Sequence, residues 1–276
     1  MKKPPLLITA TFDAGRTPQV ALSRTEDRVE KHMQGFLAWL KDPFFSHIVF
    51  VKNCSVKIHA EILREAAFSY GKELEFIQVT STPRTILQGK GYGEGNLIRK
   101  ALEKSEFLWQ SDDFFKITGK LYSPGVQSLF TREGIGEFFL SFPPETCEIG
   151  LLRKLFSPLY QSEGGSALLG LLRRGCRVPW GMIAAIPSGW IDTRFYRVNR
   201  NFYLKALRRS HRRVQDQLGY TLEAAIHDDL KAHPSVRMIQ QPPIILGTSG
   251  TLGTTAGEYT AELREEARKL AERLTA

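Results

Sequence analysis

Short apolar runs alternate with amphipathic segments along the first half of the chain. The runs at 6–12, 47–52, 74–79 and 107–110 have the length and composition of strands. Between them, apolar residues recur at spacings of three and four over 24–41, 57–70 and 94–104, which predicts helices. Strands that alternate with helices form a parallel sheet with both faces covered. The pattern therefore predicts an α/β fold with a mostly parallel, Rossmann-like sheet and helices on both faces.

The second half of the chain is less regular. Its pattern predicts strands over 137–142, 182–186 and 244–246. It predicts helices over 202–218, 221–232 and 258–276, the last of them amphipathic. Proline, glycine, serine and threonine are frequent over 233–257, which predicts loops around the short strand. Because neither an internal repeat nor a linker is evident, we expect one domain over 1–276.

Composition and charge narrow the functional classes. The chain has 276 residues, 42% of them hydrophobic, and a net charge of +9. A basic excess favours phosphorylated or polyanionic ligands, but no helix-turn-helix, zinc-finger or RNA-recognition signature accompanies it, which disfavours nucleic acid. The cysteines Cys54, Cys147 and Cys176 form no Cys-x-x-Cys pair, which excludes a zinc ribbon and fits reduced thiols. No apolar run of about 18 residues appears, so we expect no transmembrane helix, and the reduced thiols favour a cytoplasmic location.

Polar residues follow the first two predicted strands. Thr9 and Thr11 lie at the end of the first strand, and Asn53 follows the second. Parallel sheets bind ligands beyond the carboxyl ends of their strands. We therefore expect these side chains near a bound nucleoside, with simple strand-end hydrogen bonding as the alternative.

A glycine-rich segment precedes the third predicted helix and reads Gly89-Lys90-Gly91-Tyr92-Gly93-Glu94-Gly95-Asn96. Glycines before a helix leave backbone N–H groups free to face an anion, and Lys90 adds a positive charge. We expect Lys90, Gly91, Gly93 and Glu94 to contribute to a diphosphate site. The segment lacks the Lys-Ser/Thr ending of a P-loop, so a flexible turn is the alternative.

A second segment combines two carboxylates with two lysines and reads Ser111-Asp112-Asp113-Phe114-Phe115-Lys116-Ile117-Thr118-Gly119-Lys120. At the end of a strand over 107–110, Asp112 and Asp113 could hold manganese or magnesium on a diphosphate. Alternatively, Lys116 and Lys120 could neutralise a leaving diphosphate without a metal. A turn or helix cap is the competing interpretation of Asp112.

Together, residues 89–96 and 113–122 resemble the "KGxGE … KITGRY" pair of small bacterial glycosyltransferases that build lipopolysaccharide or capsule. Three further stretches are similar to that group in the same order: 191–196 to "DTRFF", 220–223 to "YxLE" and 247–253 to "GxSGxxG". The resemblance implies a GT-A-like domain that transfers a sugar from a nucleotide-sugar donor to a glycan or lipid-linked acceptor. Lys120 departs from the family pattern, which usually has an arginine with its planar fork.

The resemblance also implies roles for parts of the chain. Residues 1–120 form the half that binds the nucleotide sugar, and 121–257 form the acceptor half. Thr118, Gly119, Ser249 and Gly250 are implied donor contacts. An inverting transfer needs a base for the acceptor hydroxyl, for which Glu223 and Asp192 are the candidates. Glu223 could instead complement the dipole of a helix N-terminus.

A basic run in the second half of the chain suggests membrane contact, and two alternative functions are also considered. The basic run Lys205–Arg213 could contact anionic lipid at the inner face of the cytoplasmic membrane, with a solvated helix face as the simpler interpretation. One other function is a sugar-phosphate nucleotidyltransferase, whose basic glycine-rich loop after the first strand is echoed faintly at 13–18. The other is a non-catalytic module that binds polyanions.

Overall fold

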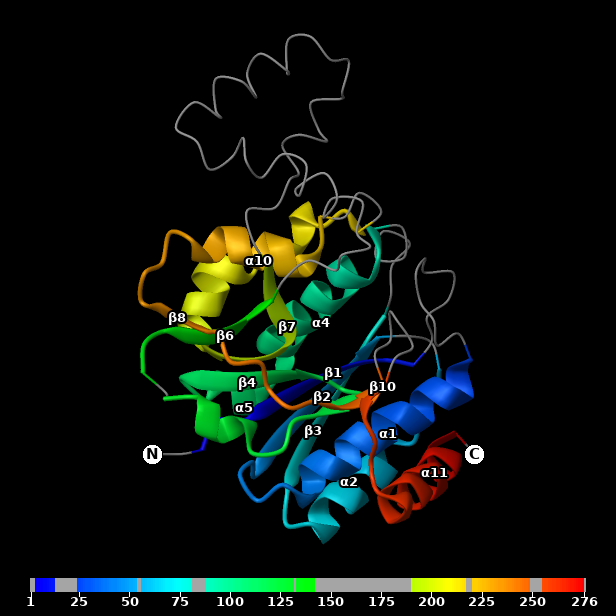
Figure 1. The fold of residues 1–276 in the computed structure, drawn as a ribbon. Helices are drawn as coiled ribbons and strands as arrows, with labels where there is room; N and C mark the ends of the chain where they lie inside the picture. Colours follow the sequence, from blue (N-terminus) through cyan, green and yellow to red (C-terminus); the bar gives the residue numbers. More distant parts are fainter. Residues whose placement is uncertain are drawn as a thin grey trace.

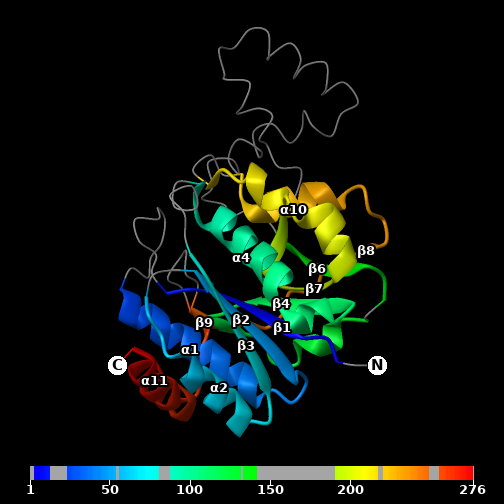
Figure 2. The ribbon, with the colours of Figure 1, turned by 180° about the vertical axis from the view of Figure 1, so that it is seen from behind.

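A seven-stranded sheet forms the centre of the molecule. The computed structural model describes residues 3–12, 24–53, 56–80, 88–131, 133–141, 190–216, 220–248 and 255–275. The strand order is β3-β2-β1-β4-β7-β6-β8. Figure 1 and, from behind, Figure 2 show α1, α2 and α11 on one side of this sheet and α4 and α10 on the other. The predicted class, α/β with a mostly parallel sheet covered on both faces, is confirmed.

Strand direction defines the two edges of the sheet. Its strands are β1 (Leu6–Thr11), β2 (His47–Asn53), β3 (Glu73–Val79), β4 (Asp113–Thr118), β6 (Gly136–Ser141), β7 (Trp190–Asn199) and β8 (Val236–Ile239). All of these run in one direction except β7, which is antiparallel to both β4 and β6. The carboxyl ends of the parallel strands therefore meet the amino end of β7 at one edge. A second, small sheet has the order β10-β9-β5 and contains β5 (Leu121–Tyr122), β9 (Leu246–Thr248) and β10 (Thr255–Gly257).

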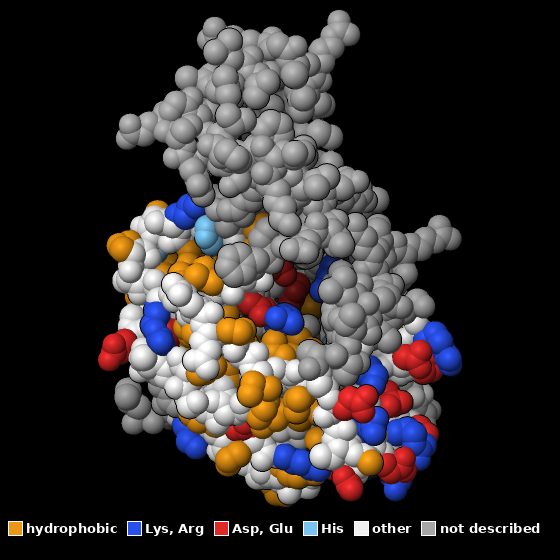
Figure 3. All heavy atoms as spheres, viewed as in Figure 1, with side chains coloured by type: hydrophobic (Ala, Val, Ile, Leu, Met, Phe, Trp, Pro, Cys, Tyr) orange, Lys and Arg blue, Asp and Glu red, His pale blue; other side chains and the backbone are white. Residues whose placement is uncertain are grey.

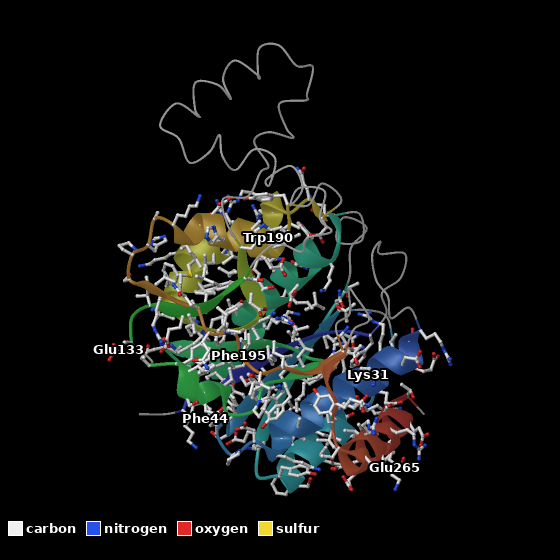
Figure 4. All side chains as sticks on the ribbon, viewed as in Figure 1. Lys31, Phe44, Glu133, Trp190, Phe195 and Glu265 are labelled. Atoms are coloured by element: carbon white, nitrogen blue, oxygen red, sulfur yellow. The ribbon has the colours of Figure 1, made fainter. Side chains whose placement is uncertain are left out.

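The helices largely follow the predicted periodicity. Those confirmed, with small shifts at their ends, are α1 (Thr25–Lys41), α2 (Ala60–Ser69), α10 (Leu222–Leu230) and α11 (Ala261–Thr275). Alternate strand residues explain their packing, because Leu6 and Ile8 contact the α1 side whereas Leu7 lies in the core on the α4 side. The α1 side is also rich in aromatic rings. Trp39 stacks on Phe195 with centroids 5.7 Å apart, and Figure 4 shows Phe195 near the centre of the molecule.

Two predictions around the functional segments are wrong. The run 107–110 belongs to a short helix, α5 (Glu106–Trp109), because the Ser105 side chain accepts a hydrogen bond from the Leu108 N–H at 3.1 Å and caps it. The strand is instead β4, which begins at Asp113. In addition, α4 (Lys90–Lys104) starts four residues before the predicted helix. The sequence suggested a loop here because glycine has a low helix propensity. Gly91, Gly93 and Gly95 are nevertheless helical, because the start of α4 is buried against neighbouring segments.

The second half departs further from the prediction. The helix expected over 202–218 is three short pieces, α9 (Arg200–Phe202), a π-helix η2 (Tyr203–Leu207) and a 3₁₀-helix η3 (Ser210–Arg213). The sequence pattern missed β7 and β8, and another short 3₁₀-helix, η1 (Val126–Leu129), follows β5. The strand expected over 182–186 and all three cysteines lie outside the described residues. In the described parts of the chain, helices that are both long and apolar enough to cross a membrane are absent.

Replacement of Gly35 by alanine tests the contact between α1 and the turn after β4. A Cβ atom at Gly35 would lie 2.4 Å from the Gly119 carbonyl oxygen and 2.9 Å from the Lys120 carbonyl carbon. Glycine to alanine in an exposed helix stabilises it by about 1 kcal/mol. Here the clash is with backbone, so we expect Gly35→Ala to lose about 1–3 kcal/mol of unfolding free energy, measured by urea denaturation. Stability at or above that of the wild type would contradict this contact.

Candidate functional site

Charged and polar side chains gather where the carboxyl ends of β1 and β4 meet the amino end of β7. The register fixes this meeting point, because Thr9 lies opposite Thr118 and Ile117 lies opposite Phe195. Two further carboxylates come from helices, Glu94 from α4 and Glu223 from the first turn of α10. Figure 3 shows acidic and basic side chains together in the middle of this face of the molecule. This is the edge at which parallel sheets bind ligands.

Glu94 is the centre of a hydrogen-bond network that joins α4 to the sheet. Its Oε1 accepts hydrogen bonds from Thr9 Oγ1 at 3.2 Å and Thr118 Oγ1 at 3.0 Å, and it forms an ion pair with Lys116. Burial alone would raise the pKa of Glu94, but Lys116, Lys90 and the hydrogen bonds outweigh it and hold the pKa below its ordinary value. Glu94 is therefore an anion at neutral pH, fixed beside the ends of β1 and β4.

Lys116 is fully buried and has no proton left for a ligand. Its ammonium donates to Glu94, to Thr118 Oγ1 at 3.1 Å and to the Thr193 carbonyl at 2.6 Å. These three acceptors use all three ammonium protons. The prediction that Lys116 binds phosphate directly is therefore not supported by its contacts. The structure makes it the residue that holds Glu94 and β7 in place.

Lys120 is buried and forms no ion pair within the described part of the chain. It lies on the turn after β4, with only 4% of its surface exposed. Burial, Arg28 and Lys90 lower the pKa of Lys120 to about 7, against a weaker opposing effect of Glu94. Among the described residues, no carboxylate forms an ion pair with its ammonium group. A buried ammonium among other cations is costly, and an anionic ligand would remove that cost.

Arg28 and His32 bring α1 to the same place. The Arg28 guanidinium, itself buried, donates to the Thr11 carbonyl from Nε at 2.8 Å and from Nη2 at 2.6 Å. Burial, Lys120 and Arg28 lower the pKa of His32 well below its usual value, so its imidazole is neutral. Sequence reasoning missed both residues, because they lie on the apolar-patterned helix α1 with no motif around them. Arg28 and His32 therefore both lie near Lys120, and neither supplies a negative charge to it.

The glycine-rich segment packs against protein instead of opening onto a ligand. A Cβ atom at Gly89 would lie 2.5 Å from Asp216 Oδ2, and one at Gly95 would lie 2.3 Å from His211 Cβ. The Gly91 N–H donates to Asp216 Oδ2 at 2.8 Å, and the Gly93 N–H donates to the Gly89 carbonyl at 3.2 Å. The expectation that Gly91 and Gly93 offer free N–H groups to a diphosphate is therefore wrong. The chain's own carboxylate occupies the start of α4.

Asp216 is a functional candidate that sequence reasoning missed. It follows the extended residue Val214, and burial raises its pKa to about 6 against the lowering effect of the Gly91 N–H. The charges of Glu223 and Glu94 raise the pKa of Asp216 further, whereas Lys90 lowers it. No sequence signal could have found Asp216, since its importance comes from the glycines on another helix.

Glu223 and Asp192, the two candidate bases, both lie at this edge. Glu223 is in the first turn of α10, and its Oε1 accepts a hydrogen bond from Thr193 Oγ1 at 2.8 Å. Asp192 is held by Arg194, whose Nε lies 2.9 Å from Oδ1 and whose Nη2 lies 2.7 Å from Oδ2. Because Arg194 already neutralises Asp192, Glu223 is the more available proton acceptor.

Asp112 and Asp113 lie at the opposite edge of the sheet. They come at the amino end of β4, so the prediction that they follow a strand at its carboxyl end is wrong. Asp113 pairs with Arg197, at 2.5 Å from Nη1, and Asn199 donates to it at 3.3 Å. These two aspartates therefore do not fit a metal on a diphosphate at the candidate site. Over the described ranges, no group of three or more histidine, cysteine, aspartate or glutamate residues could hold a metal ion.

The other predicted residues have mixed outcomes. Asn53 ends β2 opposite Thr11, and its Oδ1 is buried with no hydrogen-bond partner among the described residues. Gly119 packs under α1, because a Cβ there would lie 2.8 Å from His32 Nδ1. Ser249 and Gly250 lie outside the described residues. In the basic run, His211 is buried, whereas the exposed cations are Lys205, Arg208, Arg209, Arg212 and Arg213.

Comparison with known proteins identifies similar folds at low sequence identity. No protein-family model and no curated protein matches the chain. The glycosyltransferase GlyE of Streptococcus pneumoniae TIGR4 is 8% identical with a TM-score of 0.46, and the match covers 86% of this chain and 46% of GlyE, so the chain spans about half the length of that protein. Core-mannan synthase A of Aspergillus fumigatus, in its Mn/GDP form, is 13% identical with a TM-score of 0.46 over 98% of this chain and 84% of that one.

A nucleoside-diphosphate-sugar pyrophosphorylase from Vibrio cholerae RC9 is also similar, with 12% identity and a TM-score of 0.45 over 96% of this chain and 99% of that one. The similar structures thus include more than one class of enzyme. At such low identity they concern the fold alone, and the functional proposal below rests on the residues of the site.

The buried pair of Lys116 and Glu94 makes a direct prediction for stability. Lys116→Met leaves the Glu94 charge buried and unpaired, so we expect a loss of about 3–5 kcal/mol of unfolding free energy. The double variant Lys116→Met/Glu94→Gln removes both charges and should recover most of that loss, measured by denaturant unfolding as a double-mutant cycle. A double variant no more stable than Lys116→Met would contradict the pairing.

Proposed function

We propose that this protein is a glycosyltransferase that moves a sugar from a nucleotide-sugar donor to a glycan or lipid-linked acceptor. The observation that carries the proposal is the buried Lys120 ammonium, which lies beside Arg28 at the carboxyl ends of parallel strands with no counterion among the described residues. A diphosphate supplies the charge that such a cluster lacks. The motif resemblance favours a sugar nucleotide as the source of that diphosphate.

Lys120 and Arg28 have different tasks in this proposal. Lys120 has its ammonium available, whereas the Arg28 guanidinium spends two donors on the Thr11 carbonyl. Thr11 and Asn53, at the ends of β1 and β2, are the proposed nucleoside contacts. Lys90 begins α4 and adds positive charge near Lys120.

Glu223 is the proposed base. The acceptor hydroxyl oxygen attacks the anomeric carbon of the donor, and Glu223 takes the hydroxyl proton as the new glycosidic bond forms. The bond between the anomeric carbon and the β-phosphate oxygen breaks, and its electron pair leaves with the nucleoside diphosphate. The Lys120 ammonium stabilises the negative charge that develops on that oxygen. Asp192 is the alternative base, in spite of its pairing with Arg194.

Product analysis tests the proposed reaction. The protein is incubated with individual nucleotide sugars and with glycan or lipid-linked acceptors, each with and without manganese, and the products are separated. Release of a nucleoside diphosphate or monophosphate together with a sugar-extended acceptor supports glycosyl transfer. Formation of pyrophosphate from a nucleoside triphosphate and a sugar phosphate would instead identify a nucleotidyltransferase. Binding with no turnover in either assay would identify a non-catalytic module.

Replacement of Lys120 by glutamine tests the diphosphate site. We expect Lys120→Gln to weaken nucleoside diphosphate binding by about 10- to 100-fold, since a hydrogen bond to a charged group contributes about 1.5–3 kcal/mol. Affinity is measured by calorimetry and by the shift in melting temperature that a ligand of the native state causes. The matched control is Lys104→Gln at the exposed end of α4. Equal affinities of the two variants would remove Lys120 from the site.

The depressed pKa of Lys120 predicts a specific pH dependence of binding. The free protein holds Lys120 with a pKa of about 7, and a bound diphosphate raises that pKa because it favours the charged form. Above pH 7 the protein must therefore take up a proton when it binds, and affinity should fall by up to about tenfold per pH unit until the bound-state pKa is reached. Calorimetry in buffers of different ionisation enthalpy measures the proton uptake. Uptake that persists in Lys120→Gln would assign it to another group.

A further inference from the structure

Thr193 lies where the two halves of the candidate site meet. It is near the amino end of β7 and only 2% of its surface is exposed. Its backbone carbonyl accepts a hydrogen bond from Lys116 Nζ at 2.6 Å, and its side-chain Oγ1 donates to Glu223 Oε1 at 2.8 Å. One residue therefore connects the buried lysine that holds Glu94 to the carboxylate at the start of α10.

The two contacts fix different parts of the residue. The fully buried Lys116 secures the Thr193 backbone, and because Lys116 is bound by Glu94 and Thr118 as well, that backbone has little freedom. The Thr193 hydroxyl then donates a hydrogen bond to one carboxylate oxygen of Glu223. Among the described residues, Glu223 makes no other hydrogen bond through its carboxylate. The orientation of that carboxylate thus depends on one hydroxyl group.

We propose that Thr193 is a positioning residue that turns the free carboxylate oxygen of Glu223 toward the acceptor hydroxyl. This inference rests on the proposed function, in which Glu223 takes the acceptor proton. A carboxylate held at Oε1 presents Oε2 in a single direction, whereas an unheld carboxylate samples several rotamers. The Thr193 backbone is itself held by Lys116, the residue that also positions Glu94. The proton acceptor and the donor side of the site are therefore set by one network.

Thr193→Val and Thr193→Ser test the inference as a pair. Valine keeps the shape of threonine and removes the hydroxyl, whereas serine keeps the hydroxyl. We expect Thr193→Val to lower kcat by about 10- to 100-fold, because small misplacement of a reacting group has effects of this size. The KM for the donor and the affinity for nucleoside diphosphate should stay within about twofold, and Thr193→Ser should retain most of kcat.

A double-mutant cycle separates this role from a structural one. In a Glu223→Gln background, removal of the Thr193 hydroxyl should cause no further fall in kcat, because the two residues act through one group. A full additional loss in that background, wild-type kcat in Thr193→Val, or equal losses in the valine and serine variants would each overturn the inference. Melting temperatures confirm folding, and Thr193→Ala replaces the valine variant should that one fail to fold. A wild-type protein that turns over no nucleotide sugar would instead contradict the proposed function.

Discussion

The organisation of the site depends on how two buried lysines are balanced. Lys116 has three acceptors, one of them the Glu94 carboxylate, and this network joins α4, β1, β4 and β7 in one rigid unit. Lys120, four residues later, has Arg28 and Lys90 as neighbours and no described carboxylate in an ion pair. Removal of a charge from water is costly unless a partner replaces the water. The charge of the first lysine is therefore satisfied within the fold, whereas an anion would favour the charged form of the second.

Lys116 also explains why Glu223 lies at the same edge as the ends of β1 and β4. The reversed strand β7 brings its amino end to the carboxyl ends of β1 and β4. Lys116 reaches across from β4 to the backbone of Thr193, and the Thr193 side chain continues to Glu223 on α10. A single antiparallel strand in a parallel sheet thus brings Thr193, and through it Glu223, to the carboxyl ends of β1 and β4.

Local patterns in the sequence predicted much of this edge. The periodicities placed β1, β2 and α1 correctly. The carboxyl-end rule selected Thr9 and the resemblance selected Thr118, and the structure places these two residues opposite each other. The motif resemblance selected Glu94, Lys120 and Glu223, which the fold brings to one edge. These features follow from short-range spacing, which a single sequence displays directly.

The features that the sequence could not reveal depend on contacts between distant segments. The glycines of α4 imitate a phosphate-binding loop, and only the position of Asp216 and His211 against them shows that they serve close packing. The error at 107–110 moved β4 by several residues and so reversed the expected edge for Asp112 and Asp113. Arg28 and His32 lie within an ordinary amphipathic pattern, and their role follows only from the approach of α1 to the turn at Gly119.

Titration of the Lys120 side chain, with and without a nucleoside diphosphate, tests whether this lysine binds the proposed ligand. Lysine side chains labelled with ¹³C at Cε report the titration of each ammonium by NMR, and Lys120→Gln identifies the signal. The proposed diphosphate site predicts a midpoint near pH 7 in the free protein and a midpoint about two or more units higher when a nucleoside diphosphate is bound. A midpoint near the usual value of about 10.4 for lysine in the free protein, or one that nucleotide does not move, would contradict it.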